Sequence, residues 1–314
     1  MSSPTAETMR SGVWTLESGS ALLHELIDYA GLFPPASLSM ASSVANYDAY
    51  LKSRWNWILG RLIVPVARLA EFEQAFETLP RSSETLSNWR LSVLPGSDVV
   101  ADVARIGDFN ARRAGGDSGP RAVIDAVEVK VANPAEIGQL ARIIPAELET
   151  YFECPFAIAG ECVSAVSDVG RRAKIRTGGE TADKVPPPAS VVEFVRLCAS
   201  ANVPFKATAG LHHPLRSVHK LTYQPESPSG MMHGFLNVFL AAAFLRGGME
   251  TAQAVSLLEE QSPAAFRFDG DGVTWREQRV SSKELVVARQ NFALSFGSCS
   301  FTEPIDDLQS LGLL

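Results

Sequence analysis

The feature that most constrains the fold of this chain is a regular alternation of short apolar runs with longer segments of helical periodicity. Runs of strand length occur at 26–33, 61–66, 90–96, 122–131, 149–156, 172–179, 203–210 and 292–301. Between most of them lie amphipathic segments such as LAEFEQAFETL, PAEIGQLARII and SVVEFVRLCASA. Strands that alternate with helices form βαβ units and a parallel sheet. Eight such strands predict a closed (β/α)8 TIM barrel rather than an open doubly wound sheet.

The interval from 211 to 291 is far longer than the others and breaks this rhythm. It contains a loop rich in Pro and Ser (YQPESPSG), an apolar helix at 234–245, a second helix (METAQAVSLLEEQ) and a hairpin (FRFDGDGVTWRE) that turns on Asp-Gly pairs. We interpret it as one ordinary barrel helix plus an insertion, about 217–280, between the seventh and eighth strands. The Ala-rich helix at 234–245 is interpreted as a core helix rather than an interface.

Length and composition favour one domain. A chain of 314 residues that is 46% hydrophobic can bury one large core, so we expect a flexible segment at 1–20 and a single domain at 21–314. The formal net charge of -7 argues against nucleic-acid binding, which needs a clustered positive field. The N-terminal sequence is unlike a secretory signal, and the apolar segment at 234–245 is too short to cross a bilayer. We therefore expect a cytoplasmic protein with no membrane partner. The sequence leaves open whether the chain forms a homo-oligomer.

The cysteines are scattered along the chain. They form no CxxC pair and show no zinc-site spacing with histidines, so we expect no metal and reduced, mostly buried thiols at Cys154, Cys162, Cys198 and Cys299.

Strand parity assigns many charged side chains to the interior of the barrel. In DAVEVKV the valines suit the face covered by helices, and the same alternation in AKIRT and PFKATA places the charged residues on the opposite face. The side chains expected inside, with Glu153 on the same face as Tyr151, are Glu128, Lys130, Glu153, Lys174, Arg176, Lys206 and Thr208. Burying charge costs several kcal/mol unless it is paired or used. The arrangement is therefore either a catalytic site at the carboxyl ends of the strands or an ion-pair lattice that joins Glu128 to Lys174 and Glu153 to Lys206.

The catalytic interpretation rests on the chemistry of paired lysines. A second cation disfavours the ammonium form of a lysine, so a free amine becomes available near neutral pH and can attack a carbonyl to form an imine. A carboxylate and the second lysine could then move protons at the carbinolamine and enamine stages. Two lysines and one carboxylate are the components of a class I aldolase, although lysine pairs also bind phosphate.

The order of these motifs resembles the deoxyribose-phosphate aldolase family of (β/α)8 barrels. KIRTGG at 174–179 and FKATAGLH at 205–212 are similar to the family's KTSTGF-like sixth strand and VKASGGIR-like seventh strand. The resemblance implies that Lys174 forms the imine and that Lys206 favours its free amine. DAVEVKV resembles the family's DEIDMV-type strand, which implies that Glu128 is the acidic proton relay. Shorter similarities in LIDYAGLFPPAS, LIVPVARL, SVLPG and FGSCSF follow in the same order.

The chain departs from the family pattern at several of these positions. Arg176 and Gly179 replace a small polar residue and an aromatic residue, Glu128 replaces an aspartate, and the insertion has no counterpart in compact members. The longer side chain of Glu128 displaces the carboxylate and alters the relay geometry. Arg176, a permanent cation near Lys174, could hold a phosphate or carboxylate or could itself favour the free amine.

Glycine-bearing and hydroxyl-bearing turns end the sixth, seventh and eighth strands. In eight-stranded barrels the phosphate site commonly lies beside the last two strands, where backbone amides bind anions. The alternative is that the glycines serve only the turn conformation. The predicted phosphate-binding residues are Gly178, Gly179, Gly210, Gly297, Ser298 and Ser300.

Two adjacent histidines, His212 and His213, follow the strand that carries Lys206 and belong to the loop at the catalytic end. They could contact the substrate or be hydrogen-bonded loop residues. Adjacent histidines point apart, so a shared metal would need Glu153 as well, and we predict none.

Together these patterns predict an aldehyde-lyase of the class I aldolase type that uses no cofactor. Its substrate would be a small carbonyl compound or a sugar phosphate, contacted by Glu153, Lys130, Arg176, Thr208, His212 and His213. The alternatives are an isomerase or lyase that forms no imine on the same barrel, and an inactive barrel that binds sugar phosphates. The sequence predicts no particular substrate.

Overall fold

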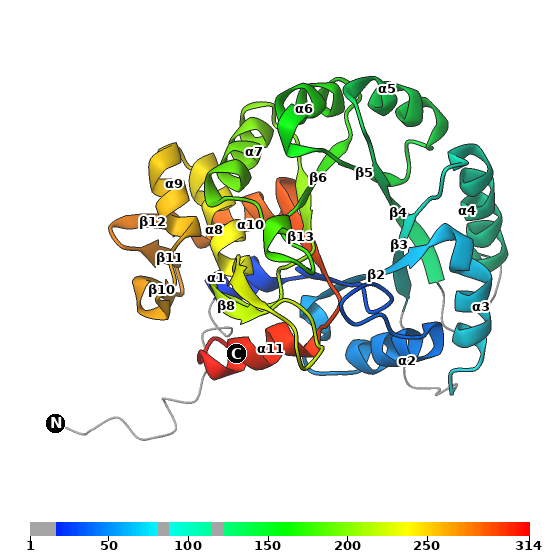
Figure 1. Ribbon diagram of the computed structural model, residues 1–314, viewed down its shortest axis with the longest axis horizontal. Coiled ribbons are helices and arrows are strands. Elements are labelled where there is room, and N and C mark those ends of the chain that lie inside the picture. The colour runs from blue at the N-terminus through cyan, green and yellow to red at the C-terminus, as the bar shows by residue number, and fades with distance from the viewer. Residues whose placement is uncertain (1–16, 81–87, 115–121) are drawn as a thin grey trace.

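The chain folds as a closed barrel of parallel strands surrounded by helices (Figure 1). The computed structural model describes residues 17–80, 88–114 and 122–314. The barrel strands are β1 (Ile27–Tyr29), β2 (Leu59–Pro65), β3 (Trp89–Leu94), β4 (Ala122–Lys130), β5 (Glu149–Glu153), β6 (Arg172–Arg176), β7 (Phe205–Thr208) and β13 (Ala293–Ser298). Their order is β1-β13-β7-β6-β5-β4-β3-β2, and β1 closes the ring by pairing with both β13 and β2. The predicted (β/α)8 barrel is confirmed.

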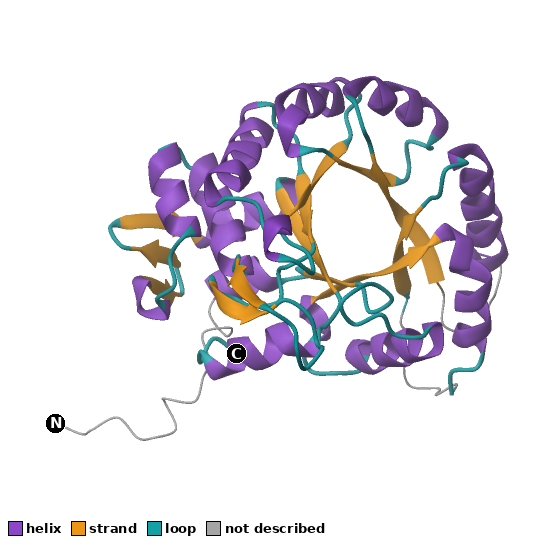
Figure 2. Cartoon of the chain, in the orientation of Figure 1, coloured by secondary structure: helices purple, strands orange, loops and turns teal. Residues whose placement is uncertain are grey.

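Helices cover the outside of the strand ring (Figure 2). They include α2 (Met40–Leu51), α3 (Leu69–Glu77), α4 (Val99–Ala114), α5 (Pro134–Ile143), α6 (Ala159–Asp168), α7 (Pro188–Ser200) and α11 (Thr302–Ser310). The apolar strand residues expected on the outer face, such as Val127, Ile175 and Ala207, are buried in one hydrophobic core cluster. The parity of the strands therefore divides an apolar outer layer from a polar interior.

Local signals in the sequence start several helices. Asn133 caps α5 by accepting a hydrogen bond from the backbone N–H of Glu136, and Pro134 occupies the first turn, where no N–H is needed. Ser281 and Glu284 form a reciprocal capping box at the start of α10 (Ser282–Asn291). These caps set where the chain leaves a loop and enters a helix.

The predicted insertion lies between β7 and the eighth barrel strand, β13. It consists of a hairpin, β8 (Ser217–Lys220) and β9 (Ser229–Met232), two helices, α8 (Phe235–Arg246) and α9 (Thr251–Leu258), and a meander, β10 (Phe266–Asp269), β11 (Gly272–Trp275) and β12 (Gln278–Ser281). The Asp-Gly hairpin is confirmed as the antiparallel pair of β10 and β11. The sequence did not predict the β8–β9 hairpin or β12.

Helix α8 is a core helix, as expected. It contacts α7, α9, α10 and β13, and its residues from Phe235 to Phe244 are buried. Phe235 and Phe239 lie against Phe296 of β13, with ring centroids 5.2 and 5.9 Å away. A helix that is apolar on every face is stable only when neighbours surround it.

The N-terminal helix α1 (Glu17–Leu23) begins within the segment 1–20 that was expected to be flexible. Residues 1–16 lie outside the described part, but 17–20 are helical because α1 packs on α10. The buried guanidinium of Arg289 on α10 stabilises this contact. It donates hydrogen bonds to the main-chain carbonyls of Leu22, His24, Ala293 and Leu294.

Two further expectations can be compared with the described residues. The four cysteines are free and buried, as predicted. Within the described ranges, no helix combines the length and the apolar character needed to cross a membrane.

Candidate functional site in the barrel interior

The site is organised around one buried carboxylate, Glu128 of β4. Its Oε2 lies 2.8 Å from Nζ of Lys174 on β6, and its Oε1 lies 2.6 Å from Nζ of Lys206 on β7. The hydroxyl of Ser92 on β3 donates to the same Oε1 at 2.7 Å. The backbone register sets Lys174 directly opposite Lys206. The structure therefore brings together the three side chains that parity predicted for the centre of the barrel.

The two lysines differ in their remaining partners. Nζ of Lys174 lies 2.9 Å from Oε2 of Glu153, whose Oε1 is 3.2 Å from Nε of Arg176. The Arg176 side chain is 50% exposed, so this branch runs from Lys174 toward solvent at the carboxyl ends of the strands. Lys206 is only 1% exposed, and its Nζ lies 2.5 Å from Oδ2 of Asp28 on β1. Lys206 is thus the deeper of the two.

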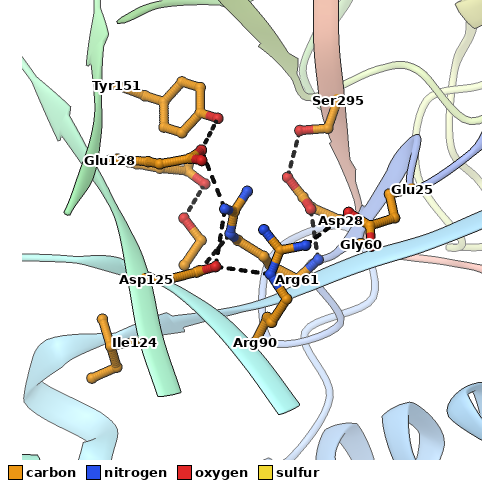
Figure 3. A network of polar contacts seen from close by, with 12 residues as sticks. Glu25, Asp28, Gly60, Arg61, Arg90, Ile124, Asp125, Glu128, Tyr151 and Ser295 are labelled. Carbon is orange, nitrogen blue, oxygen red and sulfur yellow. Dashed lines mark hydrogen bonds and ion pairs between the residues drawn. The ribbon is translucent and has the colours of Figure 1, made fainter. Parts of the chain in front are cut away.

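Asp28 anchors the deep end of the network (Figure 3). The hydroxyl of Ser295 donates to Oδ2 of Asp28 at 2.7 Å, and the backbone N–H of Arg61 donates to Oδ1 at 2.7 Å. The Lys206 ammonium also lies 5.3 Å from the centroid of the Tyr151 ring. The sequence analysis missed Asp28, although a single acid in the apolar strand IDY was the signal that could have identified it.

Burial and neighbouring charges fix the ionisation of three groups. Burial alone would raise the pKa of Glu128, yet the two lysine ammoniums hold it well below its ordinary value. Burial also acts to raise the pKa of Glu153, but the charges of Lys174 and Arg176 outweigh burial, and the pKa of Glu153 is lowered. Burial would lower the pKa of Lys206, but Asp28 and Glu128 raise it above its ordinary value. Both glutamates are therefore carboxylates and Lys206 is an ammonium near neutral pH.

The lattice interpretation predicted two ion pairs. One of them is present in the structure, and the prediction of the other is wrong. Glu128 pairs with Lys174 as expected, but Glu153 contacts Lys174 and Arg176 instead of Lys206. The register places Glu153 directly opposite Lys174 on the neighbouring strand β6, where the two side chains meet.

Two other residues expected to contact substrate lie at strand ends. Lys130 is exposed at the last position of β4, beside Glu153 in register, and lies outside the buried network. Thr208 ends β7 opposite Arg176, and its carbonyl accepts hydrogen bonds from the backbone and hydroxyl of Thr177. Both face the end of the barrel at which Arg176 meets solvent.

The glycine turns after β6 and β7 touch one another. A Cβ on Gly178 would lie 2.8 Å from Cα of Gly210, which itself has φ +76°. The hydroxyl of Thr177 joins the turns by donating to the carbonyl of Ala209 at 2.7 Å. The two turns approach too closely for a Cβ at Gly178 or Gly210, and the positive φ of Gly210 also favours glycine. Phosphate binding at these turns stays a prediction.

The other residues of the predicted phosphate site have separate surroundings. Gly179 lies against the side chain of Lys184, and Gly297 is opposite Asp28 and Thr208 in register. Ser298 ends β13, and its hydroxyl accepts from the backbone N–H of Ser300 at 3.3 Å. The hydroxyl of Ser300 accepts from the backbone N–H of Glu303 at 3.1 Å, at the start of α11. These hydroxyls are therefore engaged locally at the same end of the barrel.

The adjacent histidines after β7 bind separate carboxylates of α11. Nδ1 of His212 is 3.1 Å from Oε2 of Glu303, and Nδ1 of His213 is 2.6 Å from Oδ2 of Asp307. The ring of His213 also stacks on His219, with centroids 3.3 Å apart. Nε2 of His213 also lies 3.9 Å from Oε1 of Glu303, so both rings approach this carboxylate, and neither is hydrogen-bonded to Glu153. Among the described residues, no group of three or more His, Cys, Asp or Glu is arranged to hold a metal ion.

Comparison with known proteins adds no family to this picture. No protein-family model matches the chain. No curated protein matches it significantly either. The resemblance to the aldolase family therefore stays a prediction, and the candidate roles below depend on the geometry of the barrel interior.

Proposed function

We propose that the barrel interior performs class I aldolase chemistry, in which Lys174 forms an imine with a small aldehyde or ketone. The observation that carries this proposal is the sharing of one buried carboxylate, Glu128, by Lys174 and Lys206. Two ammoniums on one carboxylate repel each other, which favours loss of a proton from one of them. Lys206 lies deepest, between Glu128 and Asp28, whereas Lys174 lies nearer the open end of the barrel, so we assign the attacking amine to Lys174.

The position of Lys174 suits a nucleophile. It lies on the branch that leads through Glu153 to the half-exposed Arg176, so a substrate entering at the carboxyl ends of the strands meets Lys174 before Lys206. Catalytic groups of eight-stranded barrels lie at this end. Arg176, Lys130 and Thr208 are the proposed contacts for polar groups of the substrate at this mouth, together with His212 and His213 of the loop.

The proposed reaction has a complete path for its protons and electrons. The free Nζ of Lys174 attacks the carbonyl carbon, and the carbinolamine loses water to give an iminium ion. In cleavage, a base removes the proton of the β-hydroxyl, the carbon–carbon bond breaks, and its electron pair moves to the iminium nitrogen to give an enamine. Protonation of the enamine carbon and hydrolysis then release the second fragment and Lys174. We assign these proton transfers to Glu128, since it contacts both lysines, with Glu153 as the second carboxylate on Lys174.

A sugar phosphate is the proposed substrate class. The support is the convergence of the turns that carry Gly178, Gly210 and Ser298 with Arg176 at the ends of β6, β7 and β13. A guanidinium and backbone amides at the end of the last barrel strands are suited to a phosphate group.

Reductive trapping tests the imine directly. The full chain is incubated with acetaldehyde, acetone, dihydroxyacetone phosphate or glyceraldehyde 3-phosphate, reduced with borohydride, digested and mapped by mass spectrometry. We expect a stable adduct on Lys174 that disappears in Lys174→Leu and persists in Lys283→Leu, a control that removes an exposed lysine of α10 away from the site.

The remaining outcomes would identify a different function. Metal-dependent turnover without an adduct would indicate an isomerase or lyase that forms no imine. Tight binding of sugar phosphates with neither adduct nor turnover would indicate an inactive binding barrel. The second of these is favoured by one observation, since Glu128, Glu153, Lys174 and Lys206 each already have an oppositely charged partner.

A further inference from the structure

A polar cavity lies at the end of the barrel opposite the proposed imine site. It has a volume of about 470 Å³ and is lined by the first residues of several barrel strands together with α1 and α10. Small-molecule sites typically measure roughly 300–1,000 Å³. Its charged lining includes Arg61, Arg90, Arg172, Arg289, Glu25 and Glu149, while Asp28 forms part of its inner wall. The cavity is large enough for a small organic ligand.

Two of the arginines are held by carboxylates (Figure 3). Nε of Arg61 lies 2.6 Å from Oδ1 of Asp125, and Nε of Arg90 lies 2.8 Å from Oδ2 of the same residue. Arg61 also reaches Glu149 at 3.2 Å, and Arg90 reaches Glu25 at 2.7 Å. These contacts fix the two guanidiniums at the cavity wall and account for three carboxylates.

The other two arginines are balanced less closely by carboxylates. Nη2 of Arg172 lies 3.6 Å from Oε1 of Glu149, beyond hydrogen-bond distance, and its Nε is buried with no hydrogen-bond partner. Arg289 is 7% exposed and donates to main-chain carbonyls rather than to a carboxylate. Burial lowers the pKa of Arg289 to about 9, which reflects the cost of its charge there. The charges of Asp28 and Glu25 offset part of this cost, although Nζ of Lys206 already lies 2.5 Å from Oδ2 of Asp28.

We propose that this cavity binds a small oxyanion, the carboxylate or phosphate group of a small molecule, with Arg172 as its principal contact. The planar guanidinium fork matches both groups in geometry and charge. The side chain of Arg172 lines the cavity and is 31% exposed, so part of it is accessible to a ligand. The cavity opens at the amino ends of the strands, whereas the proposed imine site opens at the carboxyl ends, so this proposal does not depend on the proposed function.

Calorimetric titration of the full chain with inorganic phosphate and with succinate, at constant ionic strength in chloride, tests the proposal. We expect one of the two probes to bind with a stoichiometry of one. Arg172→Gln should weaken that binding by about tenfold or more, since a charge-assisted hydrogen bond is lost. Arg196→Gln is the matched control, because it removes the same charge from an exposed ion pair with Glu193 and should leave affinity unchanged.

A second variant guards against a folding defect in Arg172→Gln. Val286 of α10 lines the cavity, so Val286→Trp should fill the space and weaken binding without altering any charge. The preferred probe distinguishes a phosphate ligand from a carboxylate ligand.

Three results would overturn the proposal: no binding of either probe, binding that survives both cavity variants, or phosphate binding that Ser298→Asp removes and Arg172→Gln does not. The last would place the anion at the carboxyl ends of the strands. Borohydride trapping reports only on Lys174, so failure of either experiment leaves the other proposal standing.

Discussion

Replacing Glu128 by Gln should lower the free energy of unfolding, and the size of the loss follows from the contacts of Glu128. The substitution keeps the volume but removes the negative charge that Lys174 and Lys206 share at 2.8 and 2.6 Å. Breaking a buried ion pair by removing one partner costs about 3–5 kcal/mol. Each lysine keeps one carboxylate, Glu153 or Asp28, so we expect a loss near the lower limit, about 3 kcal/mol in the free energy of unfolding.

The difference between wild type and Glu128→Gln should depend on pH. The folded-state pKa of Glu128 lies below its unfolded-state value, so the stabilisation by its charge is present above the ordinary carboxyl range. It is lost as the pH falls below that range, by about 1.4 kcal/mol per pH unit, because the unfolded state gains a proton that the folded state does not. Urea unfolding at pH 7, 5 and 3.5 should show the two proteins converging at the lowest pH.

Double variants test whether the loss of stability comes from the lysine charge that Glu128→Gln leaves unbalanced. Glu128→Gln combined with Lys174→Met leaves Glu153 paired with Arg176 and Lys206 paired with Asp28, so stability should return to within about 1 kcal/mol of wild type. Glu128→Gln combined with Lys206→Met leaves Asp28 without its lysine and should recover less. Wild-type stability in the single variant, or equal recovery in both double variants, would refute the reasoning.

Three further substitutions test the proposed chemistry. Lys206→Leu should slow turnover and move the pH optimum upward, because the cation that favours the free amine is gone, and an unchanged pH profile would count against this role. Ser298→Asp should weaken phosphorylated substrates by like-charge repulsion and spare unphosphorylated ones in KM measurements, whereas equal losses would remove the case for phosphate at this turn. Glu153→Gln should lower kcat less than the roughly 10²-fold expected of Glu128→Gln, and the reverse order would make Glu153 the relay. Full activity in both variants would contradict the imine mechanism.

The barrel was predictable because each strand is a short apolar run with a turn at its end. The missed elements lack that signal. The hairpin strand SVHK is mostly polar and borders the Pro- and Ser-rich loop, and in QRVS only Val280 is buried. Such strands are held by pairing with a neighbour, as β12 is by β11, rather than by a hydrophobic face of their own.

The centre of the site was predictable for a related reason. Period-two alternation in β4, β6 and β7 places Glu128, Lys174 and Lys206 on one face, and closure of the barrel makes that face the interior. The ion-pair partners were harder to predict, because several contacts cross the barrel between strands that are not neighbours, as those of Glu128 with Lys174 and Lys206 do. Asp125 shows a further limit, since the register between β3 and β4 shifts near it and a period-two rule no longer applies.

The charged network through the barrel also restricts how this sequence can change over time. From Arg176 through Glu153, Lys174, Glu128 and Lys206 to Asp28, each group neutralises the next. A single charge-altering substitution in this network leaves an unmatched buried ion, whereas loss of Glu128 together with Lys174 leaves two complete ion pairs at its ends. Drift at these positions should therefore proceed by compensated pairs, and homologous sequences should show covariation between neighbours along the barrel axis instead of independent variation.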